Sequence, residues 1–207
     1  MTARLGEILE TIRATIETFG HSQAELFSSD PPVIRAITSL AEGADRLFAR
    51  AALDVGLALC CPFPFRQAEF ERDFVAPASR RPGSLDEFRA LLERAAHESG
   101  LACVEMDGDP AQRATAYTAC SEVVVHQSDV LCVVWDGERR QLPGGTEYAL
   151  DYAMAMDVPV VWVDARAPHH WRVVCGPADV AGSPARPTAA GALSEVRELV
   201  LRALRTP

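Results

Sequence analysis

The chain has 207 residues, of which 48% are hydrophobic and 24% charged, and its formal net charge is -9. This composition is typical of a folded globular protein, and the length suits one domain with a substantial core. The negative charge disfavours nucleic acid as a partner, because affinity for a phosphate backbone depends largely on Lys and Arg. We therefore expect residues 1–207 to form a single domain, for which nucleic acid is disfavoured as a partner but not excluded.

The N-terminal region lacks the features of an export signal. Glu7, Glu10 and Glu17 interrupt the hydrophobic stretch that a signal peptide requires. The longest apolar run, from Val130 to Trp135, is far shorter than the ~20 residues that span a bilayer. The sequence therefore predicts a cytoplasmic protein without a membrane segment.

Cysteine and histidine spacing gives no sign of a metal site. The six cysteines form no CxxC or His/Cys zinc pattern, and most lie in apolar segments; they are Cys60, Cys61, Cys103, Cys120, Cys132 and Cys175. His126, His169 and His170 have no ligand partner at a suitable spacing. Because free cysteines are often buried, we expect reduced thiols, no metal and no required cofactor.

Hydrophobic periodicity in the first half of the chain predicts helices alternating with strands. Apolar residues at three- and four-residue steps from Leu5 to Phe19 predict an amphipathic helix that ends at Gly20. Further helices are predicted over residues 42–55, 67–74 and 84–99, and strands over residues 33–38, 57–61 and 101–106.

The same alternation continues in the second half. A helix over residues 111–127 leads into a strand over residues 129–136, whose continuous apolar run suits a strand covered on both faces. A helix over 144–156, a strand over 158–163 and a C-terminal helix over 192–205 follow, and residues 166–190 are predicted to be irregular. This order predicts an α/β fold with a doubly wound, mostly parallel sheet of about five strands flanked by helices.

In a sheet of this kind, ligands bind beyond the carboxyl ends of the strands. The first turn at that edge, residues 38–45, places Thr38 and Ser39 before a helix start that contains Glu42 and Gly43. Backbone N–H groups, the helix dipole and the hydroxyls there could hold an anion. The same residues equally suit an ordinary helix start in which Asp45 interacts with the helix dipole.

A second turn follows the strand over residues 129–136. Asp136 and Gly137 come directly after this strand, and Gly144-Gly145-Thr146-Glu147 opens the next helix. Paired glycines let the backbone approach a phosphate, although the pattern is neither a Walker A loop nor GxGxxG. The alternative is a tight turn in which Thr146 or Glu147 caps the helix.

A third turn, Cys61-Pro62-Phe63-Pro64-Phe65, carries two aromatic rings after a strand. These rings could wall a pocket for a base, but packing within the core is the favoured interpretation.

Several of these blocks together resemble a known superfamily. Thr38-Ser39-Leu40-Ala41-Glu42-Gly43-Ala44-Asp45-Arg46-Leu47 is similar to a signature of the SLOG superfamily of Rossmann-like domains, which joins the Smf/DprA proteins to the LOG phosphoribohydrolases. The similarity continues, in order, through Pro62-Phe63-Pro64, residues 69–74, Ala116-Tyr117, residues 128–131, Trp135-Asp136-Gly137 and Gly144-Gly145-Thr146. The resemblance implies a Rossmann-like fold that binds a nucleotide or nucleotide-derived ligand, in many relatives as a sensor in bacterial signalling or conflict systems.

The resemblance also places a small phosphorylated ligand on the turns. It implies that the phosphate lies at the Gly-Gly-Thr turn. The expected ligand contacts are Thr38, Ser39, Glu42, Gly43, Phe63, Asp136, Gly137, Gly144, Gly145, Thr146 and Glu147. Within this set, Phe63 and Asp136 are expected near the base or ribose.

Two departures from the family pattern bear on function. LOG enzymes carry Pro-Gly-Gly-x-Gly-Thr-x-x-Glu, whereas Glu147 follows Thr146 immediately in this chain. On a helix this two-residue displacement rotates the side chain by roughly 200°, away from the family's catalytic position. The alternative function, a LOG-like nucleoside-monophosphate N-glycosidase, needs Glu42, Asp136 or Glu147 to stabilise an oxocarbenium-like ribosyl centre.

The second departure is at the start of the chain. Related domains usually begin with a strand that ends in a Gly-His-Arg-like turn, whereas this sequence begins directly with a helix. A missing strand would expose a sheet edge that a partner subunit can cover, so a homodimer is a further expectation. A degenerate domain that serves only oligomerisation is the third functional alternative.

Overall fold

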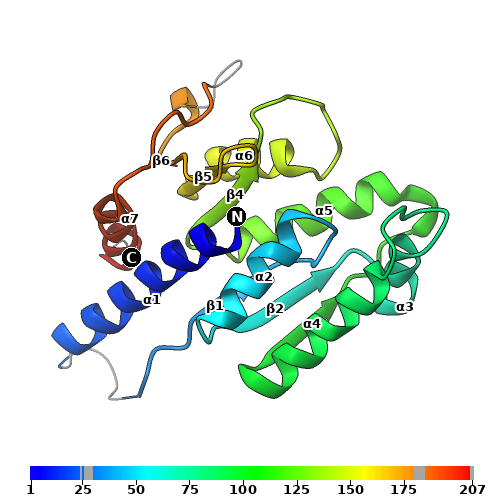
Figure 1. The fold of residues 1–207 in the computed structure, drawn as a ribbon, viewed down its shortest axis with the longest axis horizontal. Coiled ribbons are helices and arrows are strands. Elements are labelled where there is room, and N and C mark those ends of the chain that lie inside the picture. The colour runs from blue at the N-terminus through cyan, green and yellow to red at the C-terminus, as the bar shows by residue number, and fades with distance from the viewer. Residues whose placement is uncertain (24, 26–29, 180–184, 206–207) are drawn as a thin grey trace.

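A computed structural model describes residues 1–23, 25, 30–179 and 185–205 (Figure 1). Within these ranges the chain forms seven α-helices, three short 3₁₀ helices and six β-strands. The described ranges contain no helix that has both the length and the apolar character needed to cross a membrane. Residues 180–184 of the segment predicted to be irregular lie outside the described residues.

Helices and strands alternate along most of the chain. The α-helices are α1 (Thr2–Ser22), α2 (Ala44–Asp54), α3 (Gln67–Phe70), α4 (Ser84–Glu98), α5 (Arg113–His126), α6 (Thr146–Ala155) and α7 (Leu193–Arg205). The strands are β1 (Arg35–Ile37), β2 (Ala58–Phe63), β3 (Leu101–Glu105), β4 (Leu131–Trp135), β5 (Val160–Asp164) and β6 (Trp171–Val174). The α/β class is confirmed, and the first helix continues two residues past its predicted end at Gly20.

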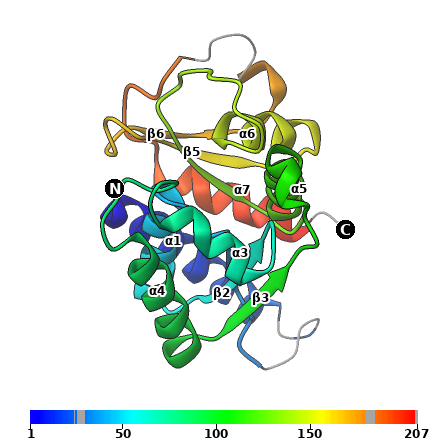
Figure 2. The same cartoon turned by 90° about the vertical axis from the view of Figure 1, so that its right-hand side faces the viewer.

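The strands form two sheets of three, so the prediction of one sheet with about five strands is wrong. The first sheet has the order β1-β2-β3 and is parallel throughout. The second has the order β4-β5-β6, in which β4 and β5 are parallel and β6 is antiparallel to β5. Figure 2 shows β5 and β6 in the upper half of the molecule and β2 and β3 in the lower half.

Strand β6 lies inside the segment that was predicted to be irregular. Trp171 and Val174 are buried, and Trp171 is paired with Val163 of β5. Because β6 has only four residues and follows a tight turn, it could be recognised only after β5 had been placed beside it.

Strand β5 connects the two parts of the hydrophobic core. Val161 and Val163 belong to the larger core, which also contains Leu59 of the first sheet and Leu199 of α7. Trp162, which points to the opposite face, belongs to a smaller core that includes residues of β4 and α6. Helix α1 packs against both α2 and α7, so one helical layer extends over both sheets (Figure 1).

Candidate functional site

A cavity of about 520 Å³ lies between β1 and β4, and its lining follows both strands. Thr38, Ser39 and Glu42 line it from the turn after β1, and the Gly144-Gly145-Thr146 turn lines it from the start of α6. The volume is within the usual range for a small-molecule site. Two turns that are about a hundred residues apart in the sequence therefore border one cavity.

The turn after β1 has an unusual backbone and a network of polar contacts. Leu40 has a φ of 58° and Gly43 a φ of 97°, values that reverse the chain before α2 begins. The Asp45 carboxylate accepts a hydrogen bond from the Ala41 N–H at 3.2 Å, so Asp45 ties the turn to the first turn of α2. Asp45 lines the cavity, and burial raises the pKa of its carboxyl above the usual value.

Glu42 lines the cavity, but one oxygen of its carboxylate is engaged by residues outside the lining. Ser79 and Ser84, which come from the loop before α4 and its first residue, both donate hydrogen bonds to one carboxylate oxygen. These bonds, the one from Ser79 first, lower the pKa of Glu42. Glu42 is therefore an ionised group held at the cavity wall.

Arg46 holds this turn in place from within the core. Its side chain is only 1% exposed and donates to the Leu40 carbonyl at 3.1 Å, the Ser84 carbonyl at 2.8 Å and a Glu87 carboxylate oxygen at 2.9 Å. Arg46 lies within the segment that resembles the family signature, but the sequence alone did not predict a role for it. An Arg in the first turn of an otherwise apolar helix face was the available signal.

The Gly-Gly turn approaches helix α5 closely. A Cβ atom on Gly144 would lie 2.6 Å from the backbone carbonyl of Tyr117, and Gly144 has a φ of +66°. The Gly145 N–H already donates to the Leu142 carbonyl at 3.0 Å, and Gly145 caps α6 without a side-chain bond. Packing against α5 thus requires Gly144, and the N–H groups at the start of α6 remain at the cavity wall.

Glu147 lies in the first turn of α6 but does not line the cavity. Its carboxylate accepts hydrogen bonds from the backbone N–H groups of Arg140 and Gln141, at 2.7 and 2.9 Å, and pairs with Arg139 at 3.1 Å. The backbone bonds, first that from Gln141, lower the pKa of Glu147. Its contacts stabilise the loop before α6.

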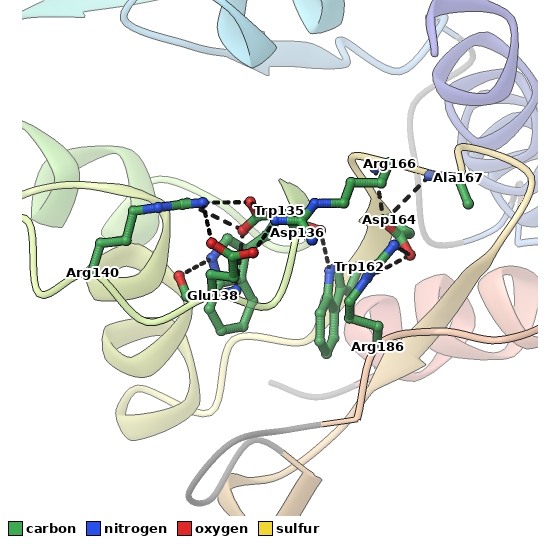
Figure 3. Close-up of polar contacts among 9 residues, drawn as sticks. All are labelled: Trp135, Asp136, Glu138, Arg140, Trp162, Asp164, Arg166, Ala167 and Arg186. Atoms are coloured by element: carbon green, nitrogen blue, oxygen red, sulfur yellow. Dashed lines mark hydrogen bonds and ion pairs between the residues drawn. The ribbon is translucent and has the colours of Figure 1, made fainter.

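Asp136 belongs to an exposed ion network after β4 rather than to the cavity wall (Figure 3). Its carboxylate pairs with Arg140 at 2.6 Å and with Arg166 at 3.2 Å, and the Arg140 hydrogen bond is the main cause that lowers its pKa to about 2. The neighbouring Gly137 also lies outside the cavity lining. It has a φ of +80°, and a Cβ atom at this position would lie 2.7 Å from the side chain of Arg186.

Phe63 is fully buried and does not line the cavity. Its ring centroid lies 5.5 Å from those of Phe70 and Phe88, within an aromatic cluster of the larger core. This position corresponds to the packing role that the sequence favoured. Gly43, the remaining residue of the expected set, also lies outside the lining.

Helix α5 supplies cavity residues that sequence reasoning did not assign. Tyr117, Cys120, Ser121 and Val124 line the cavity at three- and four-residue steps along one face of α5. The Cys120 Sγ lies 3.3 Å from the Ser39 Oγ, and burial raises the pKa of this thiol to about 11. Cys120 is therefore a protonated thiol and not an activated nucleophile. Its helical spacing was visible, but its orientation required the structure.

Within the described ranges, no cluster of three or more His, Cys, Asp or Glu side chains is arranged to hold a metal ion. The six cysteines are free.

Comparison with known proteins gives no match: no family model, no curated protein and no solved structure is significantly similar to this chain.

Proposed function

We propose that this chain is a ligand-binding sensor domain of the SLOG type, with a Rossmann-like arrangement, that binds a nucleotide or nucleotide-derived molecule in the cytoplasm. The observation that carries the proposal is that the turn after β1, through Thr38, Ser39 and Glu42, and residues 144–146 line one cavity between β1 and β4. Ligands of open parallel sheets bind beyond the carboxyl ends of the strands.

The cavity walls suit different parts of such a ligand. The N-terminus of α6, with the Thr146 hydroxyl, offers hydrogen-bond donors to a phosphate. Thr38 and Ser39 offer hydroxyls on the opposite wall, and Tyr117 lies nearby as an aromatic contact for a base. Carboxylates repel a phosphate but accept hydrogen bonds from ribose hydroxyls, so Asp45 and the Glu42 oxygen that the two serines do not use suit the sugar.

Thermal-shift measurements with AMP, GMP, ADP-ribose and cyclic AMP test the proposal. A true ligand should raise the melting temperature with saturation, because it stabilises only the folded state. The Thr146→Val variant removes a phosphate donor at nearly constant volume and should weaken binding by about tenfold, as expected for a lost hydrogen bond to a charged group. Thr115→Val, on the exposed face of α5, is the matched control and should bind normally. Equal affinity in Thr146→Val and the control would show that the phosphate does not bind at this turn.

A second candidate function is N-glycosidic bond cleavage in a nucleoside monophosphate. It is favoured by one observation, that two carboxyl groups, Glu42 and Asp45, line the same cavity and that the pKa of Asp45 is raised while that of Glu42 is lowered. Such a pair resembles an acid beside a carboxylate that stabilises positive charge.

We expect binding without cleavage, because the Glu42 carboxylate is engaged by two serines and Glu147 lies outside the cavity. The protein should release no free base from AMP, GMP or CMP over hours, as followed by chromatography. Catalytic release that disappears in Asp45→Asn or Glu42→Gln, but not in Thr115→Val, would instead establish the N-glycosidase.

A further inference from the structure

The cavity extends beyond the polar turns as a slot between the two sheets. It touches the consecutive residues Ile34 to Ser39 along β1 and the consecutive residues Gln127 to Val134 leading into and along β4. Side chains of a strand alternate between its two faces, so a space that touches every residue must lie along the strand edge. The slot is therefore bordered by an edge of each sheet.

Backbone groups on both edges point into this slot. The Thr38 N–H donates to the Cys60 carbonyl of β2. In a parallel ladder successive residues direct their N–H and C=O groups to opposite sides, so those of Ile37 point away from β2. On β4, the Leu131 N–H donates to the Pro159 carbonyl beside β5, so the peptide groups at Cys132 point away from β5. Within the described part of the chain, the ladders of the two sheets end at β1 and β4.

The side chains around the slot are apolar but incompletely packed. Seven of them pack against the larger core yet are only partly buried, and all seven line the slot: Ile12, Ile34, Phe48, Tyr117, Val130, Cys132 and Val134. They come from α1, α2, α5 and the two strand edges. Protein interiors are normally close-packed, so an apolar occupant that fills this space would be stabilised.

We propose that the slot accepts one extended, apolar and proline-free segment of a partner polypeptide, which pairs with β1 and β4 at the same time and joins the two sheets into one of seven strands. Six residues of such a segment extend about 20 Å, matching the six residues of β1 and its flanks that border the slot. A hydrocarbon ligand would fill the volume but leave the edge N–H and C=O groups unpaired.

We do not expect a second copy of this chain to occupy the slot. Each of the strands among the described residues already belongs to a sheet, so a second copy would have to withdraw a strand from its own sheet to fill the slot. A strand inserted between the two sheets lies against the helices α1, α2 and α5 that line the slot, which explains why the partner segment is expected to be apolar throughout. This mode of recognition is β-strand addition, here with two edges instead of one.

The probe for this proposal is the synthetic peptide Lys-Lys-Gly-Val-Ile-Val-Ala-Val-Thr. We expect it to raise the melting temperature of the full chain with saturation and to slow amide hydrogen exchange at Ile37 and Cys132 by at least tenfold. A matched peptide with proline at two alternate positions keeps the apolar character but lacks the N–H donors, and it should have no effect.

Two protein variants locate the binding. Ser121→Trp places a large ring in the slot from α5 and should abolish the peptide effect, whereas Thr115→Trp, on the exposed face of the same helix, should leave it unchanged. Thr146→Val should also leave peptide binding unchanged, which separates this proposal from that of the nucleotide site.

Three results would overturn the proposal: no response to the peptide, an equal response to the proline peptide, or unchanged binding by Ser121→Trp. Protection of the Ile37 and Cys132 amides in a stable homodimer without peptide would also overturn it, in favour of a second copy.

Discussion

The two turns that border the cavity are held by different parts of the chain. The turn after β1 is fixed by side chains, because buried Arg46 binds its carbonyl and Asp45 accepts its N–H. The turn before α6 is fixed by backbone contact, because Gly144 lies directly against the main chain of Tyr117. The difference shows that the first turn depends on charge, whereas the second depends on the absence of a side chain.

The largest expected effect comes from a substitution that disrupts the first turn. Arg46→Met removes a buried cation, takes one of its ion-pair partners from Glu87 and leaves the carbonyls of Leu40 and Ser84 without their guanidinium donor. We expect a loss of about 3–5 kcal/mol in the free energy of unfolding, measured by urea denaturation. Arg50→Met is the matched control, because Arg50 pairs with the same Glu87 but is 40% exposed, and it should cost less than about 1 kcal/mol. Similar losses in both variants would show that burial of Arg46 is not what fixes the turn.

The second turn should respond to a single methyl group. Gly144→Ala forces a Cβ to within 2.6 Å of the Tyr117 backbone at a φ of +66°, so we expect a loss of about 1–3 kcal/mol on urea denaturation. Gly6→Ala in helix α1 meets no atom within 4 Å and should raise the stability by about 0.5–1 kcal/mol. If both substitutions changed stability in the same direction, the close approach at Gly144 would be refuted.

The smallest expected effect concerns pH and separates two carboxyls of the first turn. The pKa of Glu42 is lowered from 4.5, so its contribution to stability is present above pH 4.5 and is lost as the pH falls through its folded value. The pKa of Asp45 is raised from 3.8, so its contribution is present below pH 3.8 and is lost as the pH rises through its folded value.

Urea denaturation between pH 3 and pH 7 tests both signs. Glu42→Gln should be less stable than the natural chain at pH 7, and the difference should shrink in acid. Asp45→Asn should gain stability relative to the natural chain as the pH rises, since the Asn carbonyl can still accept the Ala41 N–H. A gain in stability for Glu42→Gln at pH 7 would contradict the assigned contacts.

Local patterns in the sequence predicted most of the elements but not how the strands pair. The predicted strand over residues 129–136 corresponds to β4, because a continuous apolar run identifies a strand covered on both faces. The same run does not indicate which strands pair with this one. The division of the six strands into two sheets, with β1 and β4 at their edges, was therefore not predicted. Strand β6 was missed because its burial comes from pairing with β5.

The site shows the same limit. Thr38 and Thr146 could be placed at one edge of the sheet, because both follow the carboxyl ends of predicted parallel strands. Asp136 follows such a strand as well, yet it faces Arg140 and Arg166 instead of the cavity. Which way a side chain leaves a turn depends on neighbours from distant segments, as for Arg166, and spacing along the chain does not encode them.

The contact between Gly144 and α5 bears on how ligand binding at the Gly144 turn would affect α5. Helices α5 and α6 are joined there, through the Tyr148 hydroxyl to Glu122, and through a 2.8 Å contact between the His126 ring and the Tyr152 hydroxyl. With three such attachments along their length, we expect α5 and α6 to move together. We therefore expect a displacement of the Gly144 turn to move α5 as well, and Arg113, the first residue of α5, pairs with Asp73 of the 3₁₀ helix over Glu71–Phe74.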